Sequence, residues 1–138
     1  MANITGLEGI SGQLPLGQVS EQPTVFDPSV LVSVPRTLAR GVEGIEAAGF
    51  TGHDLWNCWE VSWLNPMGRP ECRIGQLVVP ADSPNLVESK SLKLFLNSFS
   101  NDSFADDQAV VDAVVAALTP ALGVAPEFHL YPITDPRF

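Results

Sequence analysis

The fold of this chain is decided by the stretch Glu88-Ser89-Lys90-Ser91-Leu92-Lys93-Leu94-Phe95-Leu96-Asn97-Ser98-Phe99. Its apolar side chains recur at the spacing of one helix face, at Leu92, Phe95, Leu96 and Phe99. The pattern predicts a helix whose apolar stripe packs against a core, with Ser89 or a near neighbour as its cap. Lys90, Lys93 and Asn97 lie largely off this stripe, which leaves them for polar contacts.

The charges of this stretch are unusual for the chain. Lys90 and Lys93 are its only lysines, and they stand beside Glu88. The protein as a whole is acidic, with 7 basic and 16 acidic residues and a net charge of -9. A carboxylate, hydroxyls and two ammonium groups placed this closely can bind a ligand that carries both a donor edge and phosphates. The alternative is an exposed first helical turn whose charges are only solvated.

Composition and charge exclude several classes of protein. A chain of 138 residues, 45% of them hydrophobic, has the size and composition of one globular domain. Its net charge argues against nucleic acid or an anionic membrane as the main partner. No apolar run approaches the roughly 20 residues of a membrane helix, and residues 1–12 lack the features of a signal peptide. We therefore expect a cytoplasmic protein.

The first third of the chain shows little periodicity. Residues 1–30 are rich in Gly, Pro, Ser and Gln, which predicts an arm laid over a surface. We place the folded domain at residues 31–138. Within it, residues 41–52 are dotted with glycines and are expected to form a loop, with room for a short helical turn around residues 44–48.

A hairpin precedes the lysine-bearing helix. Residues 55–64 include three tryptophans and have the composition of a strand. Residues 65–70 carry a turn signal, and residues 72–79 return as a second strand that Pro80 ends. Residues 83–85 then prepare the start of the helix.

A second helix and a third strand follow. Asp106 and Asp107 place acids at the positive end of that helix, and Thr119-Pro120 and Gly123 close it. Its apolar face consists of Val110, Val111, Val114, Val115 and Leu118. Residues 127–131 have the composition of a third strand.

The order strand, strand, helix, helix, strand predicts an α+β fold, in which two helices pack on one face of an antiparallel sheet. A three-stranded sheet has an unpaired edge that must be covered. The N-terminal arm, a partner chain or downstream sequence could cover it.

The cysteines and histidines give little support to a metal site. Cys58 and Cys72 are too few and too widely spaced for a zinc motif, and His53 and His129 are isolated. In the predicted hairpin, Cys58 falls opposite a residue near Leu77 and not opposite Cys72, so no disulfide is expected. Both thiols are expected to be reduced core residues.

The motif resembles the signature of the NADPH-dependent 7-cyano-7-deazaguanine reductases, nitrile reductases that make 7-aminomethyl-7-deazaguanine on the queuosine pathway. The likeness is closest to the N-terminal half of the long, two-module form, and it runs from about residue 12 to the end. It implies the tunnelling fold, which the predicted order of elements fits. The segments that carry it are Val34-Pro35-Arg36-Thr37-Leu38, Asp54-Leu55-Trp56, Glu60-Val61-Ser62-Trp63-Leu64-Asn65, Val87-Glu88-Ser89-Lys90-Ser91-Leu92-Lys93-Leu94-Phe95 and Asn97-Ser98-Phe99.

The resemblance implies a division of roles. The family uses a cysteine nucleophile that adds to the nitrile, an aspartate proton donor, and NADPH. In the short form the cysteine precedes the hairpin turn and the acid lies across it; here Asn65 and Glu71 stand at those positions. The resemblance therefore assigns no catalytic residue to this chain. It implies that Glu88, flanked by Val87 and Ser89, binds 7-cyano-7-deazaguanine.

Each implied role has a physical basis and an alternative. One carboxylate, here that of Glu88, can accept two parallel hydrogen bonds from the pyrimidine edge of a guanine analogue. A glutamate that only favours the helix dipole is the alternative. Ser89 and Lys90 are the candidates for the NADPH phosphates, and Lys93 either assists or is solvated. Cys72, the thiol near the turn, is expected to be structural and not a nucleophile.

The resemblance also implies a partner. In the long form the second module supplies the cysteine, the aspartate and a His-Glu pair; the corresponding stretch here is Phe104-Ala105-Asp106. We therefore expect this chain to be inactive alone, to need a Cys-bearing C-terminal module or partner chain, and to form homo-oligomers. The competing hypotheses are a non-catalytic deazaguanine-binding or nucleotide-binding or scaffolding protein, and another tunnelling-fold enzyme acting on pterins or purines. The absence of zinc-type ligands argues against the latter.

Overall fold

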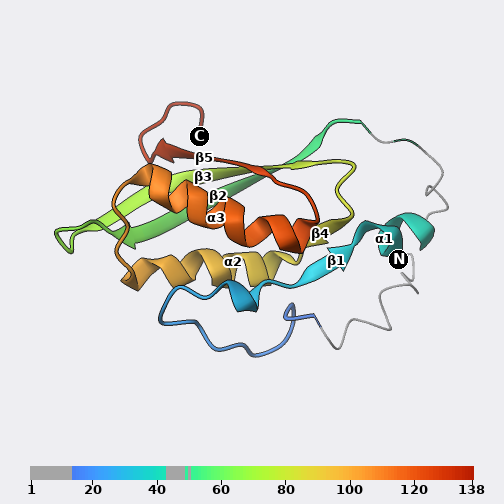
Figure 1. Ribbon diagram of the computed structural model, residues 1–138, viewed down its shortest axis with the longest axis horizontal. Coiled ribbons are helices and arrows are strands. Elements are labelled where there is room, and N and C mark those ends of the chain that lie inside the picture. The colour runs from blue at the N-terminus through green and yellow to red at the C-terminus, as the bar shows by residue number, and fades with distance from the viewer. Residues whose placement is uncertain (1–13, 43–48, 50) are drawn as a thin grey trace.

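The computed structural model describes residues 14–42, 49 and 51–138 (Figure 1). The order of its long elements is the predicted one, so the α+β class is confirmed. In chain order the elements are η1 (Pro28–Val30), β1 (Ser33–Pro35), α1 (Arg36–Val42), β2 (His53–Leu64), β3 (Pro70–Pro80), β4 (Asn85–Val87), α2 (Ser89–Asn97), η2 (Ser98–Asn101), α3 (Asp107–Leu122) and β5 (Glu127–Pro132).

The main sheet has three antiparallel strands in the order β2-β3-β5. A β-bulge between Cys58 and Val61 shifts the register of the β2–β3 hairpin. Cys58 consequently lies opposite Gly75, two residues from Leu77 along β3. The prediction that Cys58 does not face Cys72 is confirmed, and both cysteines are free.

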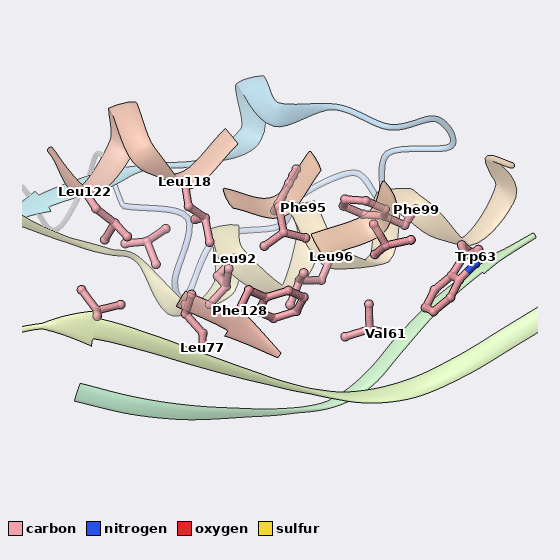
Figure 2. Close-up of a cluster of buried hydrophobic side chains, with 14 residues drawn as sticks. Val61, Trp63, Leu77, Leu92, Phe95, Leu96, Phe99, Leu118, Leu122 and Phe128 are labelled. Carbon is pink, nitrogen blue, oxygen red and sulfur yellow. The ribbon is translucent and has the colours of Figure 1, made fainter. Parts of the chain in front are cut away.

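The core lies between this sheet and the two long helices, α2 and α3, which cover one of its faces (Figures 1 and 2). The predicted stripe of the first helix is confirmed, since each of its four side chains is at most 5% exposed. The buried cluster consists of Val61, Trp63, Leu77, Val79, Val87, Leu92, Phe95, Leu96, Phe99, Val110, Val114, Leu118, Leu122 and Phe128. The predicted face of the second helix is confirmed in part, because Val111 and Val115 are only half-buried beside this cluster.

The ends of α3 follow their sequence signals at Asp106 and at Gly123, but not at Thr119-Pro120. Asp106 caps the first turn with its side chain, as its position predicts. The helix does not close at Pro120: it continues to Leu122, whose side chain is fully buried. Gly123 then ends it with φ 79°, and its N–H donates to the Thr119 carbonyl at 2.9 Å. Burial of one more apolar side chain outweighs the proline in the last turn.

A second, two-stranded sheet pairs β1 with β4, and the sequence did not reveal it. Three-residue strands are too short to show alternation. As a result, residues 83–85 do not start a helix, because β4 intervenes before α2. The sequence analysis assigned no element to residues 36–40, where α1 begins, and α1 ends at Val42, inside the loop predicted at residues 41–52. The helical turn predicted at residues 44–48 lies outside the described residues.

The described part of the arm runs along the outer side of α2 (Figure 1). Phe26 inserts its ring among Phe95, Phe99 and Phe104, with ring centroids 5.7, 4.9 and 6.2 Å away. Two side chains of the arm, those of Phe26 and Val30, thus reach the core, which its composition did not predict. The arm therefore covers the helix layer, and in residues 14–42 and 51–138 no strand pairs with the outer edge of β2.

Candidate functional site

Glu88 is the N-cap of α2, and the helix that it starts holds its side chain. Glu88 Oε1 accepts a hydrogen bond from the Lys90 N–H at 2.9 Å, and Oε2 accepts one from the Ser91 N–H at 2.8 Å. The Glu88 N–H donates to the Val32 carbonyl at 2.8 Å. The carboxylate is therefore fixed at the positive end of the helix, with the residue only 6% exposed. The predicted cap near Ser89 is confirmed, with Glu88 in that role.

The two neighbours of Glu88 differ in what they can offer a ligand. The Val87 side chain is 2% exposed and belongs to the core, so its backbone is what can face a ligand. Ser89 is exposed, and its hydroxyl lies 3.5 Å from Glu88 Oε1. The structure thus brings the Glu88 and Ser89 side chains together, and places the Val87 side chain in the core.

A groove runs between α2 and the edge of β2. It comprises two adjoining cavities of about 290 and 360 Å³ that share Glu60, Lys93, Leu96 and Asn97; we call it the α2 groove. Trp56, Trp59 and Ser89 line the first cavity, and Gln22 and Thr24 of the arm line the second. Of the two lysines, Lys93 is therefore the one whose side chain faces this groove.

Lys90 points to the arm. Its ammonium group donates to the backbone carbonyl of Pro15 at 3.0 Å and to that of Gln18. The side chain is half-buried and lines neither cavity of the α2 groove. The predicted phosphate-binding lysine is thus occupied by main-chain oxygens.

At the far end of the hairpin, Asn65 is part of the turn. Its Oδ1 accepts hydrogen bonds from the Met67 and Arg69 N–H groups at 2.9 and 3.1 Å. Its Nδ2 donates to Glu71 Oε1 at 3.1 Å. Both polar atoms of the side chain are therefore used to hold the turn, which is a structural role.

Arg73 ties this turn to α3. It donates to Asp107 at 3.0 Å and to Glu71 at 3.2 Å, and its guanidinium lies 5.4 Å from the centre of the Trp63 ring. Burial opposes the charge of Arg73, but the hydrogen bonds and charges of Asp107 and Glu71 raise its pKa above the ordinary value. Glu71, which the resemblance places at the acid position, is thus one partner of a structural ion pair.

Neither thiol is placed as a reactive nucleophile. Burial raises the pKa of Cys58 to about 11, so this thiol is protonated at neutral pH. Cys58 packs at the margin of the core, whereas Cys72 is half-buried on the opposite face of the sheet, where Ser62 lies opposite it. The expectation of two core thiols is therefore wrong for Cys72, because the alternation of β3 turns its side chain away from the helices.

The described residues show no metal-binding cluster and no membrane span. His53 is exposed, and His129 lies 3.2 Å from Glu127. Among residues 14–42 and 51–138, no group of three or more His, Cys, Asp and Glu side chains could hold a metal ion. No helix in this part of the chain has the length and apolar character to cross a membrane.

Comparison with known proteins decides the family. A model described as "Nitrile reductase, 7-cyano-7-deazaguanine-reductase N-term" matches residues 22–129. The chain belongs to this family. The resemblance inferred from residues 87–95 is thereby confirmed.

Three relatives of this chain carry the name NADPH-dependent 7-cyano-7-deazaguanine reductase. The one from Ralstonia nicotianae is 43% identical over 121 residues, which cover 86% of this chain and 44% of the relative. The one from Paraburkholderia phymatum is 45% identical over 87% of this chain and 44% of its own length. The one from Dechloromonas aromatica is 46% identical over 79% of this chain and 39% of its own length. The chain thus spans less than half the length of these relatives.

Sequence reasoning missed two parts of the candidate site. Glu60 forms a wall of the α2 groove because the bulge in β2 sets its position, and no spacing rule reports a bulge. The contact of the arm with Lys90 uses only backbone carbonyls, so no side chain of the arm signals it. The Glu88 cap had a signal, since a carboxylate directly before an apolar helical stripe is typical of a helix start.

Proposed function

We propose that this chain is the N-terminal half of an enzyme that reduces 7-cyano-7-deazaguanine to 7-aminomethyl-7-deazaguanine with NADPH, in the queuosine pathway of tRNA modification. The chain contributes a tunnelling-fold module with substrate and cofactor contacts, and the cysteine nucleophile comes from a second module. The observation that best supports this is the Glu88 carboxylate, held at the start of α2 within the segment that carries the family likeness.

Glu88 suits the pyrimidine edge of the substrate. Its two capping hydrogen bonds, at 2.9 and 2.8 Å, occupy one acceptor position on each oxygen. An ionised carboxylate offers about four such positions, so the remaining ones can accept a parallel pair of N–H donors. Because the helix holds the carboxylate before the substrate arrives, little side-chain freedom is lost on binding.

The residues beside Glu88 fit the phosphates of NADPH, which when bound supplies the hydrides of the reduction. The Ser89 hydroxyl is exposed at the rim of the α2 groove, and Lys93 forms part of its wall. Lys90 supplies a further point charge once it leaves the arm. A hydroxyl and two ammonium groups on the first turns of one helix form a donor set suited to phosphate oxygens.

A second module must provide the nucleophile. In the reaction, a cysteine sulfur adds to the nitrile carbon while its proton goes to nitrogen, and two hydrides and two protons then complete the amine and release the thiol. Asn65 cannot fill this role, and Cys58 is protonated at neutral pH with a pKa of about 11. We expect a Cys-bearing C-terminal module or partner chain to complete the site, and homo-oligomers when the chain is alone.

The test is a titration with 7-cyano-7-deazaguanine that follows the absorbance of NADPH, for this chain alone and mixed with a separately expressed Cys-bearing module. We expect oxidation only in the mixture. The Glu88→Gln variant replaces one acceptor oxygen by a donor and should lower the rate at least 100-fold, because it opposes an N–H donor of the substrate. Glu127→Gln, at an exposed carboxylate, is the matched control and should leave the rate unchanged.

Each other outcome has a defined meaning. Oxidation by the chain alone would show that it contains a nucleophile and would direct attention to Cys72. Binding of the deazaguanine without oxidation in the mixture would favour the non-catalytic binding protein. Equal rates for Glu88→Gln and Glu127→Gln would show that Glu88 acts only as a helix cap and does not bind the substrate.

A further inference from the structure

The arm and the cofactor-binding lysine are in direct contact. We call residues 14–24 the strap. Lys90 donates from its ammonium group to two strap carbonyls, those of Pro15 at 3.0 Å and of Gln18. Within the part of the chain that the structure describes, no carboxylate forms an ion pair with Lys90. The lysine is therefore held by neutral oxygens alone.

A tight turn presents these two carbonyls. The Gln18 N–H donates to the Pro15 carbonyl at 3.0 Å, which closes a β-turn over residues 15–18. Its third residue is Gly17, with φ 83°, a backbone region that residues with a Cβ atom adopt at a cost. A Cβ atom built at Gly17 meets no atom within 4 Å. The glycine is therefore required by the shape of the turn and not by lack of space.

Beyond the turn, few contacts hold the strap. The Asn97 side-chain amide donates to Gln22 Oε1 at 3.4 Å, and that of Asn101 donates to the Thr24 carbonyl at 3.2 Å. Residues 16–22 are all exposed. Segments held by a few solvent-exposed hydrogen bonds open at low free energy. Because Gln22 and Thr24 line one cavity of the α2 groove, opening the strap would also widen the groove.

We propose that the strap is an internal competitor for the cofactor: it occupies Lys90 until a phosphate group of NADPH displaces its carbonyls. This inference rests on the proposed function, because it requires Lys90 to bind the cofactor. The exchange favours the ligand, since a hydrogen bond between ammonium and phosphate is charge-assisted on both sides and one to a carbonyl is not. The affinity for NADPH is then reduced by the fraction of molecules in which the strap is closed.

The test measures NADPH binding to the full chain by energy transfer from its tryptophans, two of which line the α2 groove. Gly17→Val disfavours the turn and should tighten NADPH binding about fivefold. Leu16→Ala is the matched control, because Leu16 lies in the same turn, is 64% exposed and needs no positive φ. It should bind like the original chain, and Lys90→Ala should bind more weakly.

A protease provides a readout that does not depend on affinity. Glu21 is exposed in the strap, so a Glu-specific protease should cleave there faster when NADPH is present. In Gly17→Val the cleavage should be fast with or without NADPH. If Gly17→Val binds NADPH no more tightly than the original chain, while Lys90→Ala binds it more weakly, the strap does not compete with NADPH. The proposed function would remain intact. If no variant binds NADPH either alone or mixed with the Cys-bearing module, the proposed function fails and the strap inference fails with it.

Discussion

The two faces of the three-stranded sheet differ in what covers them. On the face toward α2 and α3, Trp63 is 1% exposed and Leu77 is fully buried. On the opposite face, Leu55 is 53% and Trp59 is 63% exposed, although Trp59 and Trp63 belong to the same strand. The ring of Phe138, 5.8 Å from that of Trp59, shows that the end of the described chain folds back over this second face.

The difference separates what stabilises the fold from what does not. The covered face forms one continuous cluster with both helices, so each of its side chains has packing partners on several elements. The open face has rings in contact with each other and with solvent. On the second face the alternation of β3 also places Ile74, which is 5% exposed. We expect the free energy of unfolding to depend mainly on the first face and little on the exposed residues of the second, and three changes test this expectation.

The largest effect is expected from truncating the buried tryptophan. Trp63→Ala should lower the free energy of unfolding by about 3–5 kcal/mol, because it leaves a cavity under the helices and removes the ring over which Arg73 lies. Trp59→Ala, on the same strand but the other face, should cost less than about 1 kcal/mol. Urea unfolding of both variants gives the comparison, with Trp63→Phe as a milder change in case Trp63→Ala does not fold. Similar losses for Trp59→Ala and Trp63→Ala would contradict the division between the two faces.

A smaller effect is expected at Gly75 of β3, where side chains of the two neighbouring strands, β2 and β5, leave no room for a Cβ atom. A Cβ atom at Gly75 would lie 2.7 Å from the Phe128 ring and 3.0 Å from Val61, so Gly75→Ala should cost about 1–3 kcal/mol. The neighbouring Gln76→Ala, which faces the other way, should change stability by less than about 0.5 kcal/mol. Thermal unfolding distinguishes the two. If Phe128→Leu fails to recover part of the loss in the Gly75→Ala background, crowding against that ring is not the cause.

Much of the covered face could be predicted from the sequence, because it follows local rules. The stripe from Leu92 to Phe99 is a helical period, and the tryptophan-rich strand with its turn is a hairpin signal. What could not be predicted depends on contacts between distant segments. The pairing of β1 with β4 joins strands too short to show a period. The continuation of α3 past Pro120 depends on a place for Leu122 in the finished core.

The candidate site divides in the same way. Glu88 and Ser89 could be found because they belong to one motif at one helix start, where capping chemistry is local. The hydrogen bonds of Lys90 to the strap could not be predicted, because the acceptors are backbone carbonyls 72 and 75 residues away along the chain and every residue has a carbonyl. Sequence reports which side chains are present, and only the fold decides which main-chain oxygens meet them.

The smallest effect is expected from the thiol at the margin of the covered face, and it appears only at high pH. Burial raises the pKa of Cys58 from 9.0 to about 11. Below pH 9 the thiol is protonated in both the folded and the unfolded chain, so it contributes no pH dependence there. As the pH rises from 9 toward 11, the unfolded chain loses this proton first, and the free energy of unfolding falls.

Cys58→Ala should remove that fall, whereas Cys72→Ala on the other face should keep it. The measurement is the difference in unfolding free energy between neutral pH and pH above 9 for the three proteins, since other groups that titrate there are common to all of them. If Cys58→Ala shows the same pH dependence as the original chain, water reaches this thiol. The buried cluster would then end at residues such as Leu77 and would not include Cys58.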